Sequence, residues 1–240
     1  MEPNKEIIRP NLVSYTFNTP EEAALVWAGL TADEQLQMAD VYQKAFGGDP
    51  WYEVGACQQC GNFTSSMSIC QSCSSTSISE AYPTEDLVGS YFPNDMLQAY
   101  LPGMFTMAKV EGRVVGFSTG GFITLGELID RKYSGNQLIL SSIMQETGVS
   151  EQDVLFYDNE TCVDNSYQGL GIGKLLGEER RMLATELGAD LICGRTVNLP
   201  WLSLKNRDLN AAGFDFLAFV PDGDNYQING LLRNFYLAFK

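Results

Sequence analysis

The sequence predicts an α/β protein in which one sheet is covered by helices on both faces. Segments with helical spacing and segments with strand-like patterns interleave along the chain. The chain has 240 residues, of which 45% are hydrophobic, so it can bury a substantial core. No apolar run approaches the roughly 18 residues that a membrane span needs. We therefore expect one folded domain over residues 1–240 and no membrane partner.

The first third of the chain carries one strand signal and two helix signals. Residues 11–17 alternate loosely between apolar and polar side chains, which favours a strand. Thr19 and Thr31 are each followed three residues later by a glutamate, the arrangement of a helix capping box. We therefore expect two helices to begin there, and the Gly-Gly-Asp-Pro run at residues 47–50 to end the second.

The middle of the chain predicts helices followed by a hairpin. Residues 84–98 have helical spacing, and Pro93 within them predicts a break between two helices. Residues 104–110 and 114–125 are strand-like and are joined by a short Glu-Gly-Arg turn, which predicts a hairpin. Residues 126–152 again show helical spacing, which suits a lid over an acceptor site, a contact in a homodimer or a surface elaboration.

The last third alternates strands and helices. A strand that begins near Val154 is followed by a helix over residues 171–187, whose apolar spacing predicts one buried face. That face comprises Ile172, Leu175, Leu176, Leu183 and Leu187. The remaining expected elements are a strand over 189–196, a helix over 201–212, a strand over 216–220, a turn over 221–225 and a strand over 234–240.

Two Cys-x-x-Cys pairs are separated by nine residues. Such pairs form two knuckles that can present four thiolates tetrahedrally to Zn²⁺. Disulfides are the alternative, but a cytoplasmic chain seldom carries them. Four sulfur ligands leave no coordination position open, which predicts a structural metal rather than a catalytic one. The sequence thus predicts a zinc-binding insert over residues 56–79, with Cys57, Cys60, Cys70 and Cys73 as ligands.

The charge of the chain restricts its partners. The net charge is −15, which disfavours attraction to phosphate backbones and anionic membranes. Residues 57–79 contain no lysine or arginine, so we expect no nucleic acid to bind the insert. The acidity suits a cationic amine as substrate, although acidity can also serve solubility alone. The start, Met1-Glu-Pro-Asn-Lys, has no signal-peptide core, and we expect a cytoplasmic protein.

A glycine-rich turn lies between the strand near Val154 and the following helix. It reads Gln-x-x-Gly-x-Gly from Gln168 through Gly171 to Gly173, and Gly169 is a third glycine within it. Glycines let the backbone approach a ligand, and the free N–H groups of a helix's first turn favour a phosphate. The spacing excludes a dinucleotide fingerprint, and it excludes a P-loop because no serine or threonine follows Lys174.

With this turn the sequence resembles the GNAT superfamily of acyl-CoA-dependent N-acyltransferases, whose signature is Gln/Arg-x-x-Gly-x-Gly/Ala. The residues from Glu160 to Asp164 resemble the strand end before that signature, and Asn198 and Gly213-Phe214 resemble later landmarks. The resemblance implies a GNAT-like, mixed and mostly antiparallel central sheet flanked by helices. It also implies acetyl-CoA as co-substrate, held by Cys162, Val163, Gln168, Gly169, Leu170, Gly171, Ile172, Gly173, Lys174 and Asn198.

The resemblance implies direct transfer of an acetyl group to a primary amine of a small molecule, a polyamine or a protein. Because the chain has no histidine, we expect Glu160 to be the general base; the alternative is a carboxylate that only anchors the substrate. Leu209 occupies the position where the family often has a tyrosine that protonates the leaving thiolate, so the proton donor is unassigned. A second hypothesis is a catalytically weak, CoA-binding scaffold whose zinc insert docks a protein partner.

Overall fold

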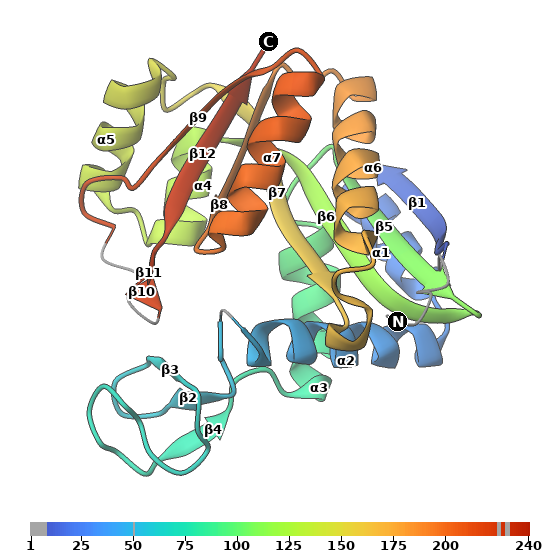
Figure 1. Ribbon diagram of the computed structural model, residues 1–240, viewed down its shortest axis with the longest axis vertical. Coiled ribbons are helices and arrows are strands. Elements are labelled where there is room, and N and C mark those ends of the chain that lie inside the picture. The colour runs from blue at the N-terminus through green and yellow to red at the C-terminus, as the bar shows by residue number, and fades with distance from the viewer. Residues whose placement is uncertain (1–8, 50, 225–226, 229–230) are drawn as a thin grey trace, which may run out of the picture.

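The main sheet has seven strands in the order β1-β5-β6-β7-β8-β12-β9 (Figure 1). The structure is a computed structural model that describes residues 9–49, 51–224, 227–228 and 231–240. All neighbouring strands are antiparallel except β7 and β8, so the predicted mixed, mostly antiparallel sheet is confirmed. The strands are β1 (Asn11–Phe17), β5 (Gly103–Val110), β6 (Arg113–Thr124), β7 (Val154–Val163), β8 (Leu191–Thr196), β9 (Asp215–Phe219) and β12 (Asn234–Phe239).

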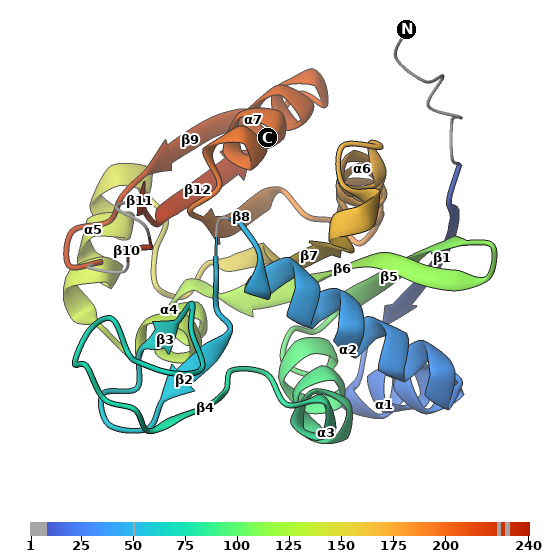
Figure 2. The ribbon, with the colours of Figure 1, turned by 60° about the horizontal axis from the view of Figure 1, so that its bottom comes forward.

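Helices cover both faces of the main sheet (Figure 2). Helices α1, α2 and η1 bury their apolar side chains against one face, and α6 and α7 bury theirs against the other. The predicted arrangement of one sheet between two helical layers is therefore confirmed. The helices are α1 (Pro20–Gly29), α2 (Ala32–Gly47), α3 (Thr84–Asp86), η1 (Leu87–Leu97), α4 (Leu125–Tyr133), α5 (Gln137–Thr147), η2 (Asn165–Tyr167), α6 (Ile172–Glu186) and α7 (Leu199–Ala211).

The two predicted helix starts are confirmed, with a difference in their caps. At α2 the Glu34 N–H donates to the Thr31 hydroxyl and the Glu34 carboxylate accepts from the Thr31 N–H, which completes a capping box. At α1 the Thr19 hydroxyl accepts from the Glu22 N–H, but the Glu22 carboxylate accepts from the N–H of Asn18, one residue earlier. Both helices therefore have their first N–H groups satisfied locally.

The predicted break at Pro93 is wrong. Pro93 lies inside η1, a π-helix of 11 residues that continues on both sides of the proline. A proline breaks an α-helix because it lacks an N–H and its ring meets the carbonyl four residues earlier. The wider π-helical turn changes that spacing, and Phe92, Met96 and Leu97 hold the segment against the core beside α1 and α2.

Residues 126–152 form most of α4 and all of α5, so the predicted helical spacing is confirmed. Ile129, Ile139 and Ile143 are buried in one apolar cluster with Tyr157 of β7 and Leu237 of β12. Helices α4 and α5 therefore complete the apolar core next to β7 and β12.

A second, three-stranded sheet projects from the main body together with the turns that carry most of the cysteines (Figure 1). In it β2 (Gly55–Cys57) lies between β3 (Phe63–Thr64) and β4 (Ile78–Glu80). We call residues 55–80 the cysteine module. Just after β4, the ring of Tyr82 packs 5.5 Å from Phe63 of the module and 5.7 Å from Phe46 of α2. The module is therefore joined to the main body by aromatic contacts as well as by the chain.

The elements after α6 follow the predicted order, and the bounds of β8, α7, β9 and β12 lie within two residues of those expected. The sequence did not predict the small hairpin of β10 (Gln227–Ile228) and β11 (Leu231–Leu232). The chain start, Pro50 and Asn225, which entered the predictions above, lie outside the described residues. No helix in the described part of the chain has the length and apolarity to cross a membrane.

Candidate functional site

A cavity of about 630 Å³ opens where β7 and β8 separate. The two strands pair over only three positions, of which Asp158 with Gly194 is the last. At the same level β7 contains a bulge, because Gly120 of β6 pairs with Asp158 whereas Thr119 pairs with Glu160, which leaves one extra residue between them. A bulge re-aims the side chains that follow it and bends the strand. The parting of the strands and the bulge together place side chains from both strands around one opening.

The glycine turn lies at this cavity and ends in the N-terminus of α6. Gly169 and Gly171 have φ of 76° and 82°, which glycine adopts without steric cost. Gly171 is the N-cap of α6 and offers no side chain to the first N–H groups, so these groups and the helix dipole are suited to an anion. Gly173 does not need the conformational freedom of glycine, because it lies within α6. A Cβ at this position would lie 3.7 Å from the Val163 side chain, which is an ordinary contact distance.

Nine of the eleven residues predicted for catalysis and cofactor binding line this cavity; the other two do not. The side chain of Cys162 is buried in the apolar cluster beside α2, and that of Leu170 packs in the cluster beside α6. Asn198 also caps α7, because its side-chain oxygen accepts from the Trp201 N–H at 2.9 Å. The nine are Glu160, Val163, Gln168, Gly169, Gly171, Ile172, Gly173, Lys174 and Asn198.

Glu160 lies directly after the bulge and is partly exposed in the cavity wall. Burial raises the pKa of Glu160 above its usual value, although the charges of Lys132 and Arg195 limit the rise. Its backbone is fixed from behind, since Arg180 Nη1 donates to the Glu160 carbonyl at 2.9 Å and to the Thr119 carbonyl at 3.1 Å. A held carboxylate with a raised pKa is a stronger base than an ordinary carboxylate.

Asp158 lines the cavity and belongs to a buried cluster of charged groups. Its Oδ2 accepts from Lys205 Nζ at 2.6 Å and from the Tyr236 hydroxyl at 2.7 Å. Its Oδ1 lies 3.0 Å from Arg180 Nε. Burial opposes ionisation of Asp158, but the charges of Arg180 and Lys205 lower its pKa, so the carboxylate is ionised. All four side chains are almost fully buried.

This charged cluster was not predicted from the sequence. A signal for Arg180 was present, since it follows Ile172 and Leu176 at four-residue spacing and therefore shares the buried face of α6. Leu175, which the apolar pattern placed on that face, is 39% exposed. The other members of the cluster come from a strand, a helix and a second strand far apart in the chain, and no local pattern links them.

The end of α2 and the segment after it supply four further cavity-lining residues, Ala45, Phe46, Asp49 and Trp51. The rings of Phe46 and Trp51 are 5.4 Å apart. From residue 45 to residue 108 the chain has no lysine or arginine. This part of the cavity thus combines aromatic faces with a carboxylate, and residues 45–108 add no positive charge to it. Such a combination suits a protonated amine.

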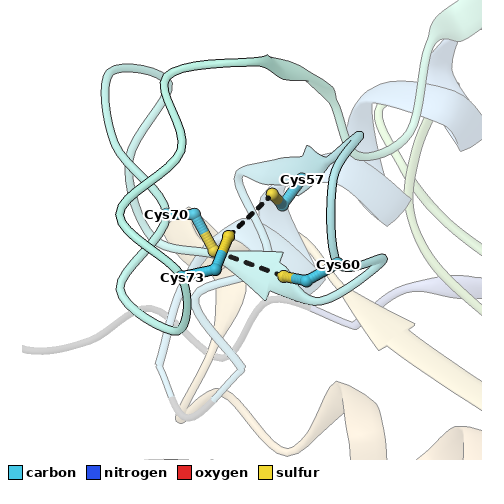
Figure 3. A group of neighbouring side chains, drawn as sticks. All are labelled: Cys57, Cys60, Cys70 and Cys73. Atoms are coloured by element: carbon cyan, nitrogen blue, oxygen red, sulfur yellow. Dashed lines mark hydrogen bonds between the residues drawn. The ribbon is translucent and has the colours of Figure 1, made fainter.

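The four cysteines of the two Cys-x-x-Cys pairs meet in the cysteine module (Figure 3). Their sulfur atoms all lie within 4.8 Å of one another, and the Cys57–Cys73 and Cys60–Cys70 pairs are each 3.6 Å apart. A tetrahedral ion with Zn–S bonds of about 2.3 Å needs sulfur atoms roughly 3.8 Å apart. All four are free thiols. The donor set and its spacing therefore fit a zinc ion.

The two cysteine turns have the same backbone geometry. The Gly61 N–H donates to the Cys57 carbonyl at 2.9 Å, and the Ser74 N–H donates to the Cys70 carbonyl at 2.8 Å. Gly61 and Ser74 both have positive φ, 74° and 60°. Backbone N–H groups of each turn lower the pKa of Cys57, to about 6, and that of Cys70. The turns therefore favour the thiolate form, which is the form that binds metal, at the first cysteine of each pair. Burial and the neighbouring thiols raise the pKa of Cys73 instead.

No protein-family model and no curated protein sequence matches this chain. Solved structures do match. The mosquito arylalkylamine N-acetyltransferase-like 5b has a TM-score of 0.51 and 12% identity over 96% of this chain and 99% of that one. A polyamine N-acetyltransferase of Drosophila melanogaster, which forms N-acetylagmatine, has a TM-score of 0.50 and 17% identity over 95% of this chain and 98% of that one. The chain therefore has the GNAT fold.

Proposed function

We propose that this protein is an acetyl-CoA-dependent N-acetyltransferase that transfers the acetyl group directly to a primary amine. The observation that carries the proposal is a single cavity that joins the glycine turn before α6 to the carboxylate of Glu160. It thus offers a site for an anionic co-substrate and a base for an amine. The fold supports the proposal, because both matched structures carry the name of an N-acetyltransferase.

In this proposal the pyrophosphate of acetyl-CoA binds the backbone N–H groups of residues 169–174. Lys174 lines the cavity and forms a surface ion pair, 3.3 Å from Glu178, so its ammonium can turn toward a phosphate at small cost. The pantetheine arm would lie along the edge of β7 at Cys162 and Val163, where β8 no longer pairs. Gln168 and Asn198 would contact the ends of that arm.

Glu160 is the proposed general base. Most alkyl amines are protonated at pH 7, and only the neutral nitrogen attacks a thioester, so removal of a proton near the thioester helps the reaction. The raised pKa of Glu160 matches this task. The amine then forms the C–N bond as the C–S bond breaks, which needs no enzyme nucleophile. Cys162 is buried away from the cavity and fits the role of a small apolar side chain.

The acceptor amine is proposed to be cationic, as the aromatic and carboxylate groups of Phe46, Trp51 and Asp49 suggest. The acidic chain, with a net charge of −15, would attract such a substrate from solution. A small amine, a polyamine and a peptide amine all meet these requirements. The Drosophila structure, whose enzyme forms N-acetylagmatine, gives one cationic class to test first.

We also propose one structural Zn²⁺ in the insert over residues 56–79, within a single domain over 1–240. When bound, the metal would cross-link the two cysteine turns, which carry too few buried apolar side chains to fold alone. Gln43 of α2 anchors the module, because its Nε2 donates to the Tyr82 carbonyl at 2.7 Å and to Glu80 at 3.1 Å. Four thiolates suit a reducing compartment, so the proposal places the protein in the cytoplasm.

The test is to incubate the purified protein with acetyl-CoA and a panel of monoamines, polyamines and peptides. We expect CoA thiol to be released with at least one amine above the rate with water alone. Binding of CoA by calorimetry without release in the presence of any amine would favour the alternative function, a CoA-binding scaffold that docks a protein through its cysteine module. If the protein neither binds CoA nor releases it from acetyl-CoA, both the enzyme and the scaffold functions are overturned.

A further inference from the structure

The inference concerns the proton that the leaving group needs, and it rests on the proposed function. When the amine displaces CoA, the electrons of the C–S bond go to sulfur and produce a thiolate. A thiol with a pKa of about 8.5 is mostly protonated at neutral pH, and a positioned acid speeds the proton transfer. Leu209 is buried and apolar and cannot supply that proton.

Tyr236 brings a hydroxyl to the cavity from β12. Its side chain crosses the neighbouring strand β8 at Gly194, where a Cβ would lie only 2.4 Å from the Tyr236 hydroxyl oxygen. The crossing places the hydroxyl 2.7 Å from Asp158, where β7 and β8 part. Tyr236 and Asp158 both line the cavity. Any larger residue at position 194 would close this path, so the glycine is required for the hydroxyl to reach the cavity.

Lys205 also contacts Asp158, and its ammonium group can supply a proton to replace the one that Tyr236 gives up. Its Nζ donates to the same Asp158 oxygen at 2.6 Å, and it is only 5% exposed. Burial and the charge of Arg180 lower the pKa of Lys205 to about 8. Burial raises the pKa of Tyr236, so the phenol is protonated at neutral pH. Asp158 therefore connects a cavity-lining hydroxyl to a buried ammonium of moderate acidity.

We propose that Tyr236 is the catalytic acid of the transfer reaction and that Asp158 and Lys205 position and recharge it. As the C–S bond breaks, sulfur takes the proton of the Tyr236 hydroxyl. The Asp158 carboxylate passes a proton from the Lys205 ammonium to the Tyr236 oxygen, and Lys205 regains a proton from water before the next cycle. The protonated amine loses two protons through Glu160, one before the attack and one as the amide forms, and Glu160 passes each of them to water. Sulfur gains one proton through Tyr236, which is replaced from water through Lys205, so each cycle converts an ammonium ion into a neutral amide and releases one net proton.

Charged and titratable groups from several elements surround the relay. Arg180 of α6, Asp208 of α7 and Cys193 of β8 face it in addition to its own three members. Arg180 opposes the charged form of Lys205 and Asp208 favours it. Because the relay needs Lys205 protonated, its contribution is present below the pKa of Lys205 and is lost as the pH rises above about 8.

The test compares Tyr236→Phe with the wild type. We expect kcat to fall about 100-fold, while the Kd of CoA from calorimetry stays within about twofold. We also expect the alkaline fall in kcat near pH 8 in the wild type to disappear in Tyr236→Phe and in Lys205→Gln. Tyr133→Phe is the matched control with wild-type kcat, because Tyr133 is buried and its hydroxyl has no partner among the described residues.

A Tyr236→Phe protein with the kcat of the wild type would overturn the inference. So would a slow variant that keeps the alkaline fall, since the tyrosine would then be structural. If Tyr236→Phe loses CoA binding altogether, Lys205→Gln decides, and an unchanged alkaline fall there overturns the relay. Failure of the proposed function looks different, because the wild type itself would then acetylate no amine.

Discussion

Asp158 and Glu160 lie two residues apart on one strand and have opposite environments. The extra residue of the bulge turns them to different faces of the sheet. Asp158 meets Arg180 and Lys205 from the helices of one face, which lower its pKa, whereas burial raises the pKa of Glu160. Two carboxylates whose pKa values are driven apart can take separate roles in acid-base chemistry. Asp158 suits a carboxylate that is ionised at rest and relays protons, and Glu160 suits a base.

Glu160→Gln preserves the shape of the side chain but cannot accept a proton. We expect kcat to fall about 100-fold and to recover partly at high pH, where more of the amine is neutral. Because its pKa is raised, we expect wild-type kcat/KM to fall with decreasing pH at a value above the ordinary carboxyl range. Steady-state kinetics across pH measure both. Glu186→Gln, at the exposed end of α6, is the control. A raised KM with unchanged kcat would leave only an anchoring role.

Gly171→Val places a β-branched residue at a φ of 82° and adds bulk beside the proposed pyrophosphate site. We expect CoA affinity to fall at least tenfold, or about 1.4 kcal/mol, in a folded protein. Calorimetry measures the affinity. Gly148→Val is the matched control, because Gly148 caps α5 at a φ of 72° and does not line the cavity. Equal CoA binding by the two variants would contradict the assignment of the turn.

At the scale of elements, the cysteine module and α2 form one continuous unit. Aromatic rings run from Trp51 at the cavity through Phe46 and Tyr82 to Phe63 of the module, with centroid distances of 5.4, 5.7 and 5.5 Å. Order in the module therefore supports the wall that carries Trp51. A structural metal in the module would therefore act indirectly on the part of the cavity that Phe46, Asp49 and Trp51 line.

We expect the purified protein to hold about one zinc per chain. Cys60→Ser or Cys73→Ser should lose the metal and expose the amides of β2 and β4 to exchange, with the main sheet protected as before. KM for the amine should rise more than KM for acetyl-CoA, since the module supports Trp51. Metal analysis, hydrogen exchange and kinetics check these outcomes. A metal-free protein with all four cysteines inert to thiol reagents would contradict the zinc assignment.

At the scale of the whole molecule, charge is unevenly arranged. The chain carries a net charge of −15, yet Arg180 and Lys205 are buried at the centre beside Asp158. Removing two cations from water is costly unless an anion compensates them, so Asp158 and its hydrogen bonds stabilise this centre. The surface is left with an excess of carboxylates, which attracts cationic solutes over a distance set by salt.

The KM of a diamine should therefore rise with ionic strength more steeply than that of a monoamine of the same length. The Debye length falls from about 10 Å at 0.1 M salt to about 3 Å at 1 M, which screens the attraction of the acidic surface for the second cation. Kinetics at saturating acetyl-CoA and several salt concentrations measure this difference, with the monoamine as control. The same salt dependence for both amines would show that net charge does not steer the substrate.

The order of the main elements, the glycine turn and the two cysteine knuckles could be predicted from the sequence, because each is a local pattern. Capping residues at Thr31, positive φ at Gly171 and the spacing of Cys57 and Cys60 act within a few residues of one chain segment. The resemblance built on the glycine turn also led to the correct sheet. These features depend on neighbours in sequence, and so could be predicted from it.

The charged cluster at the cavity and the aim of Glu160 could not be predicted from the sequence. The bulge before Glu160 depends on pairing with β6, and the cluster of Asp158, Lys205 and Tyr236 joins elements up to 78 residues apart. Pro93 was misread because packing against α1 and α2 outweighs its local tendency to break a helix. Long-range burial sets these positions, since the free energy of covering apolar surface and compensating buried charge is decided by neighbours in space.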